Sequence, residues 1–250
     1  MSSSTGRRPD RRIAARPAAK LSPLAALRLL LAVAYPLLAH WASVDGSGVV
    51  ALLALADLAV IVLLQPLAMR RGWAWLLLAL VGAGLWSLHG SKVPALLLLA
   101  PPVVFTALLS WWFGRSLGAG RVPLISRIVS GLEGCEPPAL KPELKHYTRR
   151  LTAIWTVLLA GLALTNGILA LIAVPDGVLM RLGYPPVLAV SQDAWSWFAN
   201  LLNYGIVGGF FLAEYIYRKR RFPDRPYRNF PEFMQRMAAL GPGFWRTLFD

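Results

Sequence analysis

Long apolar runs, separated by short polar connections, recur along most of the chain. A helix crosses the roughly 30 Å hydrocarbon core of a bilayer with about 20 mostly apolar residues, because each residue advances it by only ~1.5 Å. The segments that meet this requirement are Leu24–Ser43, Val49–Leu67, Gly72–Leu88, Val93–Trp112, Leu151–Val174 and Trp195–Tyr217. Segments this long satisfy their own backbone hydrogen bonds in lipid only as helices. The pattern therefore predicts an all-α fold, a polytopic membrane helical bundle with six transmembrane helices.

The positions of lysine and arginine predict how these helices are oriented. Positive charges close to the ends of a span resist translocation, so they collect on the cytoplasmic side. The N-terminal stretch, the second-to-third connection, the fourth-to-fifth connection and the tail together carry 24 of the 26 basic residues. Only Lys92 and Arg181 fall in the alternate connections. We therefore expect a multi-pass protein of the bacterial inner membrane with both termini in the cytoplasm.

The same pattern divides the chain into successive regions. They are a basic N-terminal leader (1–20), transmembrane helices one to four (21–113), a basic cytoplasmic loop (114–150), transmembrane helices five and six (151–217) and a basic cytoplasmic tail (218–250). The leader has no apolar period and is expected to be disordered. In the loop, Val122–Leu132 carries apolar residues at helical spacing, and the tail repeats this pattern. Both are expected to form amphipathic helices on the membrane surface.

Composition agrees with a membrane location and excludes several functions. Hydrophobic residues make up 56% of the 250 residues and charged residues 15%, which is more apolar surface than a soluble core of this length covers. The net charge of +14 does not indicate nucleic-acid binding, because the basic residues lie between apolar runs. The single cysteine, Cys135, excludes an intramolecular disulfide. Phosphate-loop, dinucleotide-binding and zinc-protease signatures are missing, so we expect no cofactor and no metal.

Charged residues within the predicted spans are the strongest candidates for a site. Asp57 lies near the middle of the second span, where an unpaired charge costs at least ~2.5–3.5 kcal/mol on insertion scales. It must face the bundle interior, a polar cavity or a partner charge, either as a structural residue or as a protonatable centre. Glu214 lies near the inner end of the sixth span, and Arg28 of the first span is expected at a similar depth. We expect these two residues to pair, as a structural ion pair or as part of a proton or substrate site.

Three asparagines add polar groups inside the predicted spans. Asn200 and Asn203 lie three residues apart and share one helix face, close to an aromatic start that is typical of a membrane interface. Asn166 in the fifth span presents the same choice of roles. Each asparagine is expected either to hydrogen-bond a neighbouring helix, which is the simpler interpretation, or to contact a ligand.

Catalytic patterns are weak in this sequence. His40 and Asp45 have the H-x4-D spacing seen in glycerolipid acyltransferases, in which the aspartate orients a histidine that deprotonates an acceptor hydroxyl. No cytosolic α/β domain accompanies them, so coincidence is the preferred interpretation. His89, at the outer end of the third span, could join His40 in a metal or proton site, but two histidines are too few to define one. Ser116 lies in a Gly-x-Ser-x-Gly pattern, which acts as a nucleophile elbow only on a strand-to-helix turn.

Three stretches of the chain resemble a known family. They are GRSL and RVPLISRI within residues 114–128, YTRRLTAIW at 147–155, and WSWFANLLNY at 195–204 with the Glu214-Tyr and Phe222-Pro pairs that follow. They resemble poorly characterised multi-span membrane proteins encoded in bacterial aryl-polyene and xanthomonadin-type pigment biosynthesis clusters. The likeness covers roughly residues 110–225, and the first four spans match only in hydropathy. It implies a role at the cytoplasmic face in assembling or handing over a polyene lipid, and no catalytic residue carries over.

The resemblance gives the basic cytoplasmic residues a second interpretation. Acyl carrier proteins are acidic, and a positive surface would raise their rate of encounter. That surface would comprise Lys141, Lys145, Arg149, Arg150, Arg218, Lys219, Arg220 and Arg221. The simpler interpretation is anchoring to anionic lipid headgroups, to which each basic residue contributes ~1 kcal/mol.

We therefore expect membrane lipids as partners, with an acyl carrier protein or another lipid-biosynthesis enzyme as a further candidate. The first functional hypothesis is an inner-membrane accessory component of aryl-polyene or fatty-acyl lipid biosynthesis or hand-over, without catalysis of its own. The alternatives are a small proton-coupled transporter or lipid flippase subunit centred on Asp57, and a membrane acyltransferase that uses His40 and Asp45. The sequence leaves assembly into a homo-oligomer open.

Overall fold

A computed structural model describes residues 22–91, 93–223 and 226–248 of the chain. The predicted leader, residues 1–20, lies outside these ranges. Within them the regular secondary structure is helical, apart from one pair of two-residue strands. The described helices that are long and apolar enough to cross a membrane are Pro23–Asp45, Gly48–Ala68, Val93–Arg115 and Pro142–Ile172. The expected all-α class is confirmed, with four helices of the length and apolar character that a membrane span requires.

Helices α1 (Pro23–Asp45), α2 (Gly48–Ala68) and α3 (Gly72–Ser87) come first and are joined by short turns. The side chains of Ser22 and Ser47 cap the starts of α1 and α2, as a helix N-terminus favours. Gly46, at φ +66°, adopts the left-handed conformation that ends α1. α1 and α2 pack through small residues that let their backbones approach closely. These residues are Ala39, Ala42, Ala51 and Ala54.

The next group comprises α4 (Val93–Leu97), α5 (Ala100–Arg115) and α7 (Pro142–Ile172). α5 lies against α7, and the hydroxyl of Ser110 donates to the backbone carbonyl of Thr156 at 2.9 Å. A Cβ at Gly114 would lie only 3.0 Å from the Thr156 methyl, so glycine permits the close approach of the two helices. α7 begins at Pro142 rather than at Leu151, because its polar first turns continue the helix outside the predicted apolar span.

Short elements connect α7 to the last long helix. They are β1 (Ala173–Val174), α8 (Val178–Arg181) and β2 (Val190–Ser191), and the two strands pair in parallel. The last long helix, which we call the last rod, comprises α9 (Gln192–Trp197), the π-helical turn η2 (Phe198–Leu202) and α10 (Asn203–Arg221). A π turn adds one residue to a helix and so rotates the part that follows by about 100°.

The remaining elements lie where α7 begins and α10 ends, which we call the basic end. They are α6 (Leu124–Glu133), the 3-10 turn η1 (Pro137–Ala139), α11 (Phe230–Ala239) and α12 (Gly241–Thr247). α6 overlaps Val122–Leu132, the range predicted for an amphipathic helix, and ends one residue beyond it. Its apolar residues Leu124, Val129 and Leu132 are buried against protein, chiefly α7 and the tail, so they do not face lipid.

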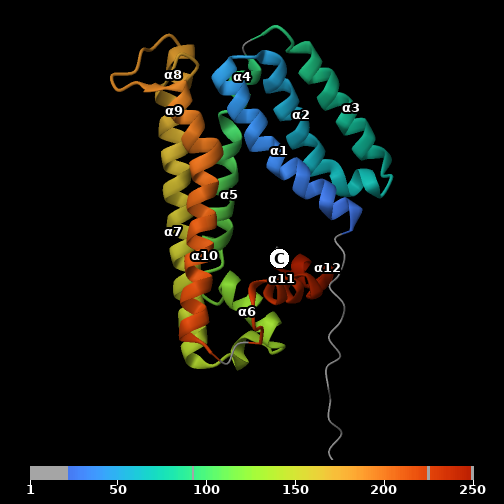
Figure 1. Ribbon diagram of the computed structural model, residues 1–250, viewed down its shortest axis with the longest axis vertical. Helices are drawn as coiled ribbons and strands as arrows, with labels where there is room; N and C mark the ends of the chain where they lie inside the picture. Colours follow the sequence, from blue (N-terminus) through green and yellow to red (C-terminus); the bar gives the residue numbers. More distant parts are fainter. Residues whose placement is uncertain (1–21, 92, 224–225, 249–250) are drawn as a thin grey trace, which may run out of the picture.

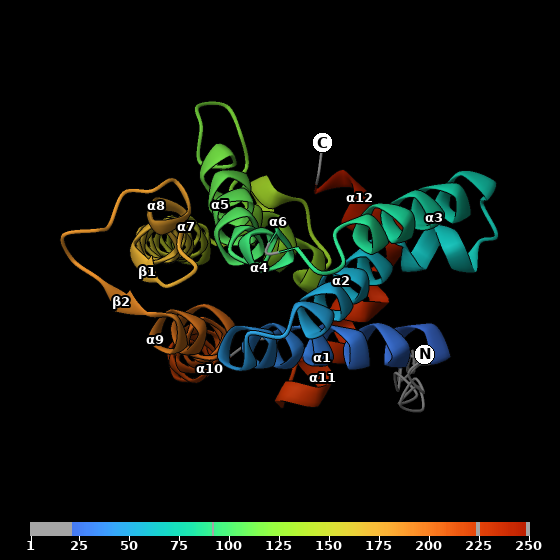
Figure 2. The same cartoon turned by 90° about the horizontal axis from the view of Figure 1, so that it is seen from above.

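The long helices form two groups (Figure 1). α5, α7 and α10 run side by side along the long axis, whereas α1, α2 and α3 slant away from them. Seen from above in Figure 2, α1 lies beside α9 at one end and points away from the last rod at its N-terminal end. α6, α11 and α12 lie across the basic end. The two groups therefore approach each other closely only at the end opposite the basic end.

Much of the apolar surface of the long helices faces outward. Leu30, Val62 and Val157 are 64%, 69% and 72% exposed, although each lies within a long apolar helix. Apolar surface left in water costs about 25 cal/mol per Å². Outward-facing leucine and valine along several helices is therefore typical of a bundle surrounded by lipid.

Candidate functional site

Polar side chains are buried where α1 and α2 meet. Asp57 of α2 is 9% exposed, and neither of its carboxylate oxygens has a hydrogen-bond partner among the described residues. The buried hydroxyl of Tyr35 in α1 also has no partner in the described part of the chain. Both Asp57 and Tyr204 of α10 lie within electrostatic range of this hydroxyl. Buried polar groups are normally satisfied, so an unpaired carboxylate here requires a proton, a cation or a further partner.

His40 of α1 forms a hydrogen bond with the last rod, far from the basic end. Its Nδ1 lies 2.9 Å from the hydroxyl of Ser196, and the side-chain amide of Asn200 donates to the same hydroxyl at 3.1 Å. Ser196 and Asn200 are almost completely buried, and the ring of Trp197 lies edge-on to His40 at 5.1 Å. The serine hydroxyl donates to His40 or accepts from it, according to the imidazole tautomer. These residues form an interhelical link between α1 and the last rod.

The acyltransferase alternative requires His40 and Asp45 to converge, and α1 separates them. Residues five apart in a continuous helix are about 140° apart around its axis. His40 faces Ser196, whereas Asp45 is exposed at the end of the helix. His89 is exposed and stacks on Trp86 at 5.7 Å. Within the described residues, no group of three or more His, Cys, Asp or Glu side chains could hold a metal ion.

The other two asparagines are buried without an interhelical bond through their oxygens. Asn166 of α7 is fully buried, and its amide donates to the backbone carbonyl of Leu162 at 2.8 Å. Asn203, at the start of α10, is 6% exposed. The side-chain oxygens of both asparagines have no partner among the residues that the structure describes. The amide of Asn200 bonds Ser196 one turn earlier in the same rod, so Asn200 contributes to the link with α1 only indirectly, through the Ser196 hydroxyl.

Glu214 is the centre of a second buried cluster, at the basic end. Its Oε1 accepts a hydrogen bond from the hydroxyl of Tyr147 at 3.0 Å and lies 3.2 Å from the Nε of Arg218, one turn further along α10. The expected pair of Glu214 with Arg28 is wrong, because Arg28 is exposed and donates to Gln65 at 3.4 Å. The N-terminal end of α1 slants away from α10 (Figures 1 and 2), so a local partner takes the place of Arg28.

Aromatic rings from the tail hold Arg218 from its other side. The Arg218 residue is 8% exposed, and its guanidinium carbon lies 5.0 Å from the centre of the Phe233 ring and 5.7 Å from that of Tyr227. Both rings belong to one apolar cluster with Tyr215 and Leu132. A desolvated cation over an aromatic face is stabilised by up to about 2 kcal/mol. The start of the tail is therefore fastened to the end of α10.

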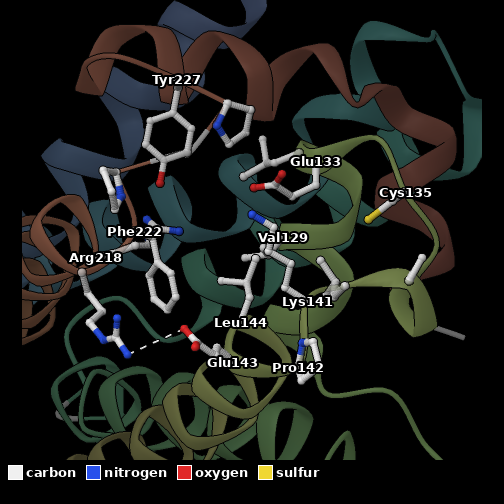
Figure 3. Close-up of a pocket in the computed structure, with 16 residues that line it drawn as sticks. Val129, Glu133, Cys135, Lys141, Pro142, Glu143, Leu144, Arg218, Phe222 and Tyr227 are labelled. Atoms are coloured by element: carbon white, nitrogen blue, oxygen red, sulfur yellow. Dashed lines mark ion pairs between the residues drawn. The ribbon is translucent and has the colours of Figure 1, made fainter.

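A pocket of about 710 Å³, which we call the tail pocket, opens beside Arg218 (Figure 3). Its walls come from α6, the η1 connection, the start of α7, the end of α10 and the start of the tail. Its apolar walls include Val129, Leu140, Leu144, Phe222, Pro226 and Tyr227. Its charged residues are Glu133, Lys141, Glu143, Arg218 and Arg221. Arg221 lies 3.7 Å from Glu143, as the dashed line in Figure 3 marks. Small-molecule sites have this size, about 300–1,000 Å³, and this mixture of apolar walls and few polar groups.

The predicted basic residues are distributed over three surroundings. Those that line the tail pocket are Lys141, Arg218 and Arg221. Those that line a smaller pocket of about 180 Å³ are Lys145 and Arg149. Those that are exposed on the surface and line neither pocket are Arg150, Lys219 and Arg220. The basic residues at this end are therefore partly gathered around a cavity instead of forming one uniform surface.

Sequence patterns did not indicate the tail pocket. Its walls come from segments far apart in the chain, and Tyr227 stands outside the apolar stripe of the tail. The Phe222-Pro pair, which belongs to the stretch that carries the family resemblance, lines the pocket, as do the predicted basic residues Lys141, Arg218 and Arg221. No family model, curated protein or solved structure matches the chain.

Proposed function

We propose that this protein is a six-span component of a bacterial inner membrane that receives a fatty-acyl or polyene amphiphile at its cytoplasmic face and hands it on during lipid assembly. The tail pocket holds the amphiphile, and the basic end faces the cytoplasm with both chain termini. The observation that carries the proposal is the character of this pocket, which combines apolar walls with cationic groups where α7 and α10 leave the predicted bilayer.

The residues of the tail pocket suit the two parts of such a ligand. Val129, Leu144 and Phe222 offer apolar surface to a hydrocarbon chain, whose burial contributes about 25 cal/mol per Å². Lys141 offers a positive charge to an anionic head, although Glu133, which lines the same pocket within electrostatic range of Lys141, offsets part of that charge. Arg218 and Arg221 are each paired with a glutamate, so they fix the shape of the site and add little net charge. The pocket therefore suits a long chain with a small anionic head.

The six-span arrangement is supported by two helices beyond the four that are long and apolar enough to span a membrane. α3 is apolar but shorter, with 16 residues, and the last rod is interrupted by its π turn. With these two, the helical rods follow the six apolar segments in order along the chain. The bias of lysine and arginine toward one set of connections supports a cytoplasmic basic end.

The choice of ligand class follows the resemblance to membrane proteins of aryl-polyene and xanthomonadin-type clusters. The range of that resemblance, roughly residues 110–225, includes most of the residues that line the tail pocket. An acidic acyl carrier protein is the partner that delivers the chain, because the basic end attracts it electrostatically. The protein then acts as an accessory component and carries out no bond-making step itself.

Photo-crosslinking tests the ligand. The full chain in lipid nanodiscs is incubated with a fatty acid that carries a diazirine near the end of its tail, irradiated, and mapped by mass spectrometry. We expect crosslinks in residues 129–144 and 218–227. Ala139 lines the pocket and is exposed, so Ala139→Trp should fill the pocket without disturbing the core and should abolish these crosslinks. Ala238→Trp, at an exposed position on α11 outside the pocket, is the matched control.

Equal labelling of both tryptophan variants would refute binding in the tail pocket. Gene deletion followed by mass spectrometry of membrane lipids and pigments then tests the role. Loss of the product agrees with assembly or hand-over, whereas its accumulation inside the cell indicates export. Alkaline phosphatase fused after Asp250 should be inactive, since a cytoplasmic C-terminus keeps the enzyme reduced; an active fusion would overturn the orientation.

Proton-coupled transport is a second candidate function, favoured by the unpaired carboxylate of Asp57 among the described residues. Asp57→Asn keeps the size of the side chain and removes its charge. If Asp57 carries a proton during transport, Asp57→Asn abolishes export while protein abundance stays normal. Full export with Asp57→Asn rules this function out and leaves the proposal for the tail pocket unaffected.

A further inference from the structure

The connection between α8 and β2 carries large exposed apolar side chains at the end of the molecule opposite the basic end. We call residues 182–188 of this connection the outer loop. Leu182, Tyr184 and Leu188 are 65%, 68% and 76% exposed, and Val187 is completely exposed. The outer loop contains no charged residue. Exposed apolar side chains gathered in this way mark contacts with a membrane or with another protein.

Both ends of the outer loop are fastened to the fold. Gly183, at φ +85°, takes the left-handed conformation that ends α8, and the backbone N–H of Tyr184 donates to the carbonyl of Leu179 at 2.9 Å. At the other end β2 pairs with β1, so that Val190 lies beside Ala173. The chain between these two anchors is short. The outer loop therefore has little freedom to fold back onto the helices.

Two successive prolines, Pro185 and Pro186, stiffen the outer loop. The ring of each proline fixes its φ near −65° and removes a backbone N–H donor. Consecutive prolines favour an extended, semi-rigid chain. Tyr184 precedes this pair, and Val187 and Leu188 follow it. The local backbone therefore keeps these three apolar side chains away from the rest of the protein.

The outer loop points sideways, across the direction of the long helices. In Figure 1 it extends sideways from the end of α7 and α9, and Figure 2, the view from above, shows it reaching outward beyond both helices. Leu164, Ile168 and Leu171 share one face of α7 by their spacing and are exposed. The apolar outer surface of α7 therefore continues to the end of the helix from which the outer loop extends.

The turns that join α1 to α2 and α3 to α4 lie at the same end and have a different composition. They include Asp45, Gly46, Ser47, His89, Gly90 and Ser91. Small and polar residues of this kind are typical of connections that remain in water. The outer loop differs from both turns in its large apolar side chains, so its surroundings should differ as well.

We propose that the outer loop inserts into the headgroup region of the bilayer at the end opposite the basic end, with Val187 and Leu188 reaching the upper part of the acyl chains. The sideways direction favours lipid as the occupant, because lipid fills the space beside a membrane-spanning bundle. A soluble partner would approach along the helix axes instead. Tyrosine is enriched at headgroup depth, which suits Tyr184.

Insertion of the outer loop would hold two helices at a fixed depth in the bilayer, because the connection that contains it joins α7 to the last rod. In the six-span orientation of the proposed function, the leaflet concerned is the periplasmic one. The inference goes beyond the proposed function, since it concerns the other end of the molecule and a contact that the tail pocket does not use.

Fluorescence quenching tests the proposal. In the full chain, Cys135→Ser removes the single native thiol, and Val187→Cys or Asp45→Cys introduces one for an environment-sensitive dye. Each labelled protein is placed in lipid nanodiscs with and without a phospholipid that carries a nitroxide near its headgroup. We expect the nitroxide to quench the dye at position 187, and aqueous iodide to quench it several-fold less there than at position 45. Asp45 is the matched control, because it is exposed in polar surroundings at the same end.

Two outcomes of the quenching experiment would overturn the proposal. Equal iodide quenching at the two positions, without quenching by the nitroxide, would place the outer loop in water. Protection from iodide without quenching by the nitroxide would indicate a protein contact, with a second copy of the chain or with another partner.

The reactivity of the unlabelled cysteines excludes an effect of the dye itself. A charged methanethiosulfonate should react several-fold more slowly with the cysteine at position 187 than with the one at position 45. Equal rates would show that the dye draws the outer loop into lipid, and would also overturn the proposal. Neither position lines the tail pocket, so the fatty-acid crosslinks and the contact of the outer loop can fail independently.

Discussion

The imidazole Nδ1 of His40 lies 2.9 Å from the hydroxyl of Ser196, although the two residues are 156 positions apart in the chain. This contact joins the slanted group of helices to the upright group at the end where the two approach (Figure 1). Toward the basic end the two groups diverge. Their relative angle therefore depends on the contacts at this one end, which include the bond between His40 and Ser196 and the packing of Leu98 against α1 and α2.

Removal of the Ser196 hydroxyl should destabilise the bundle. Ser196→Ala leaves the Asn200 amide and the His40 ring without this partner, which costs about 1–3 kcal/mol for a buried group. The measurement is the midpoint of thermal unfolding in detergent, which should fall. Ser87→Ala is the matched control, because the Ser87 hydroxyl is exposed and bonds the carbonyl of Gly84 within its own helix. Equal midpoints for the two variants would contradict the link between the helix groups.

The pair of Glu214 and Arg218 should show strong coupling. Arg218→Gln leaves the carboxylate of Glu214 buried without its charge partner, which costs about 3–5 kcal/mol. Glu214→Gln combined with Arg218→Gln removes both charges and should regain most of that loss, since Tyr147 can still hydrogen-bond the amide oxygen. Unfolding of the single and double variants in a denaturing detergent measures the difference. Additive effects would mean that the two residues do not interact.

Gly131 should control the attachment of the tail to α6. A Cβ at this position would lie 2.8 Å from Cε2 of Phe244 and 3.2 Å from Cδ2 of Leu240. Gly131→Leu should therefore push α12 away and loosen the backbone around Arg236, whose side chain is already exposed, so that trypsin cleaves there faster. Gly84→Leu is the control, because a Cβ at Gly84 meets nothing within 4 Å. Unchanged cleavage in Gly131→Leu would show that the tail does not pack on α6.

Helix α11 should loosen in acid because of Glu232. The pKa of Glu232 lies below its ordinary value, mainly because the backbone N–H of Arg228 donates to its carboxylate at 2.8 Å, and also because Arg236 donates to it. A lowered folded-state pKa contributes stability above the unfolded value, about 4.3, and this contribution is lost as pH falls through the folded pKa. Amide exchange of residues 230–239, corrected for its intrinsic pH dependence, measures the change.

Glu232→Gln is the control for this pH dependence. Its glutamine has no charge to lose, so exchange in α11 should be faster at neutral pH and should change little in acid. The N-cap bond from the Glu232 backbone N–H to Asn229 remains in this variant, which isolates the side-chain contribution. Acid loosening of the same size in both proteins would assign the effect to another group.

The positions of the helices followed from the apolar pattern because hydrocarbon imposes both length and composition on a span. α1 and α2 begin and end within two residues of the predicted segments. Ends were less predictable where a helix continues into polar surroundings, as α7 does toward Pro142. A helix can continue through polar residues beyond the membrane boundary, so the apolar pattern does not mark where it begins.

Contacts between distant segments could not be read from periodicity. The pairing of Arg28 with Glu214 assumed parallel helices, and the slant of α1 removes Arg28 from that position. The burial of Asp57 was predictable, because its charge could not face lipid. The bond between His40 and Ser196 was not predictable, since it depends on how α1 packs against the last rod.

The π turn at Phe198–Leu202 has a consequence for the whole last rod. In a regular helix, positions 196 and 214 are separated by about five complete turns and would point the same way. The additional residue offsets them, so that Ser196 faces His40 of α1 while Glu214 faces Tyr147 of α7. One additional residue thus allows a single helix to hydrogen-bond two neighbouring helices on different sides. Deletion of this residue would place Ser196 and Glu214 on the same face of the helix. The protein would then lose either the contact with His40 or the contact with Tyr147.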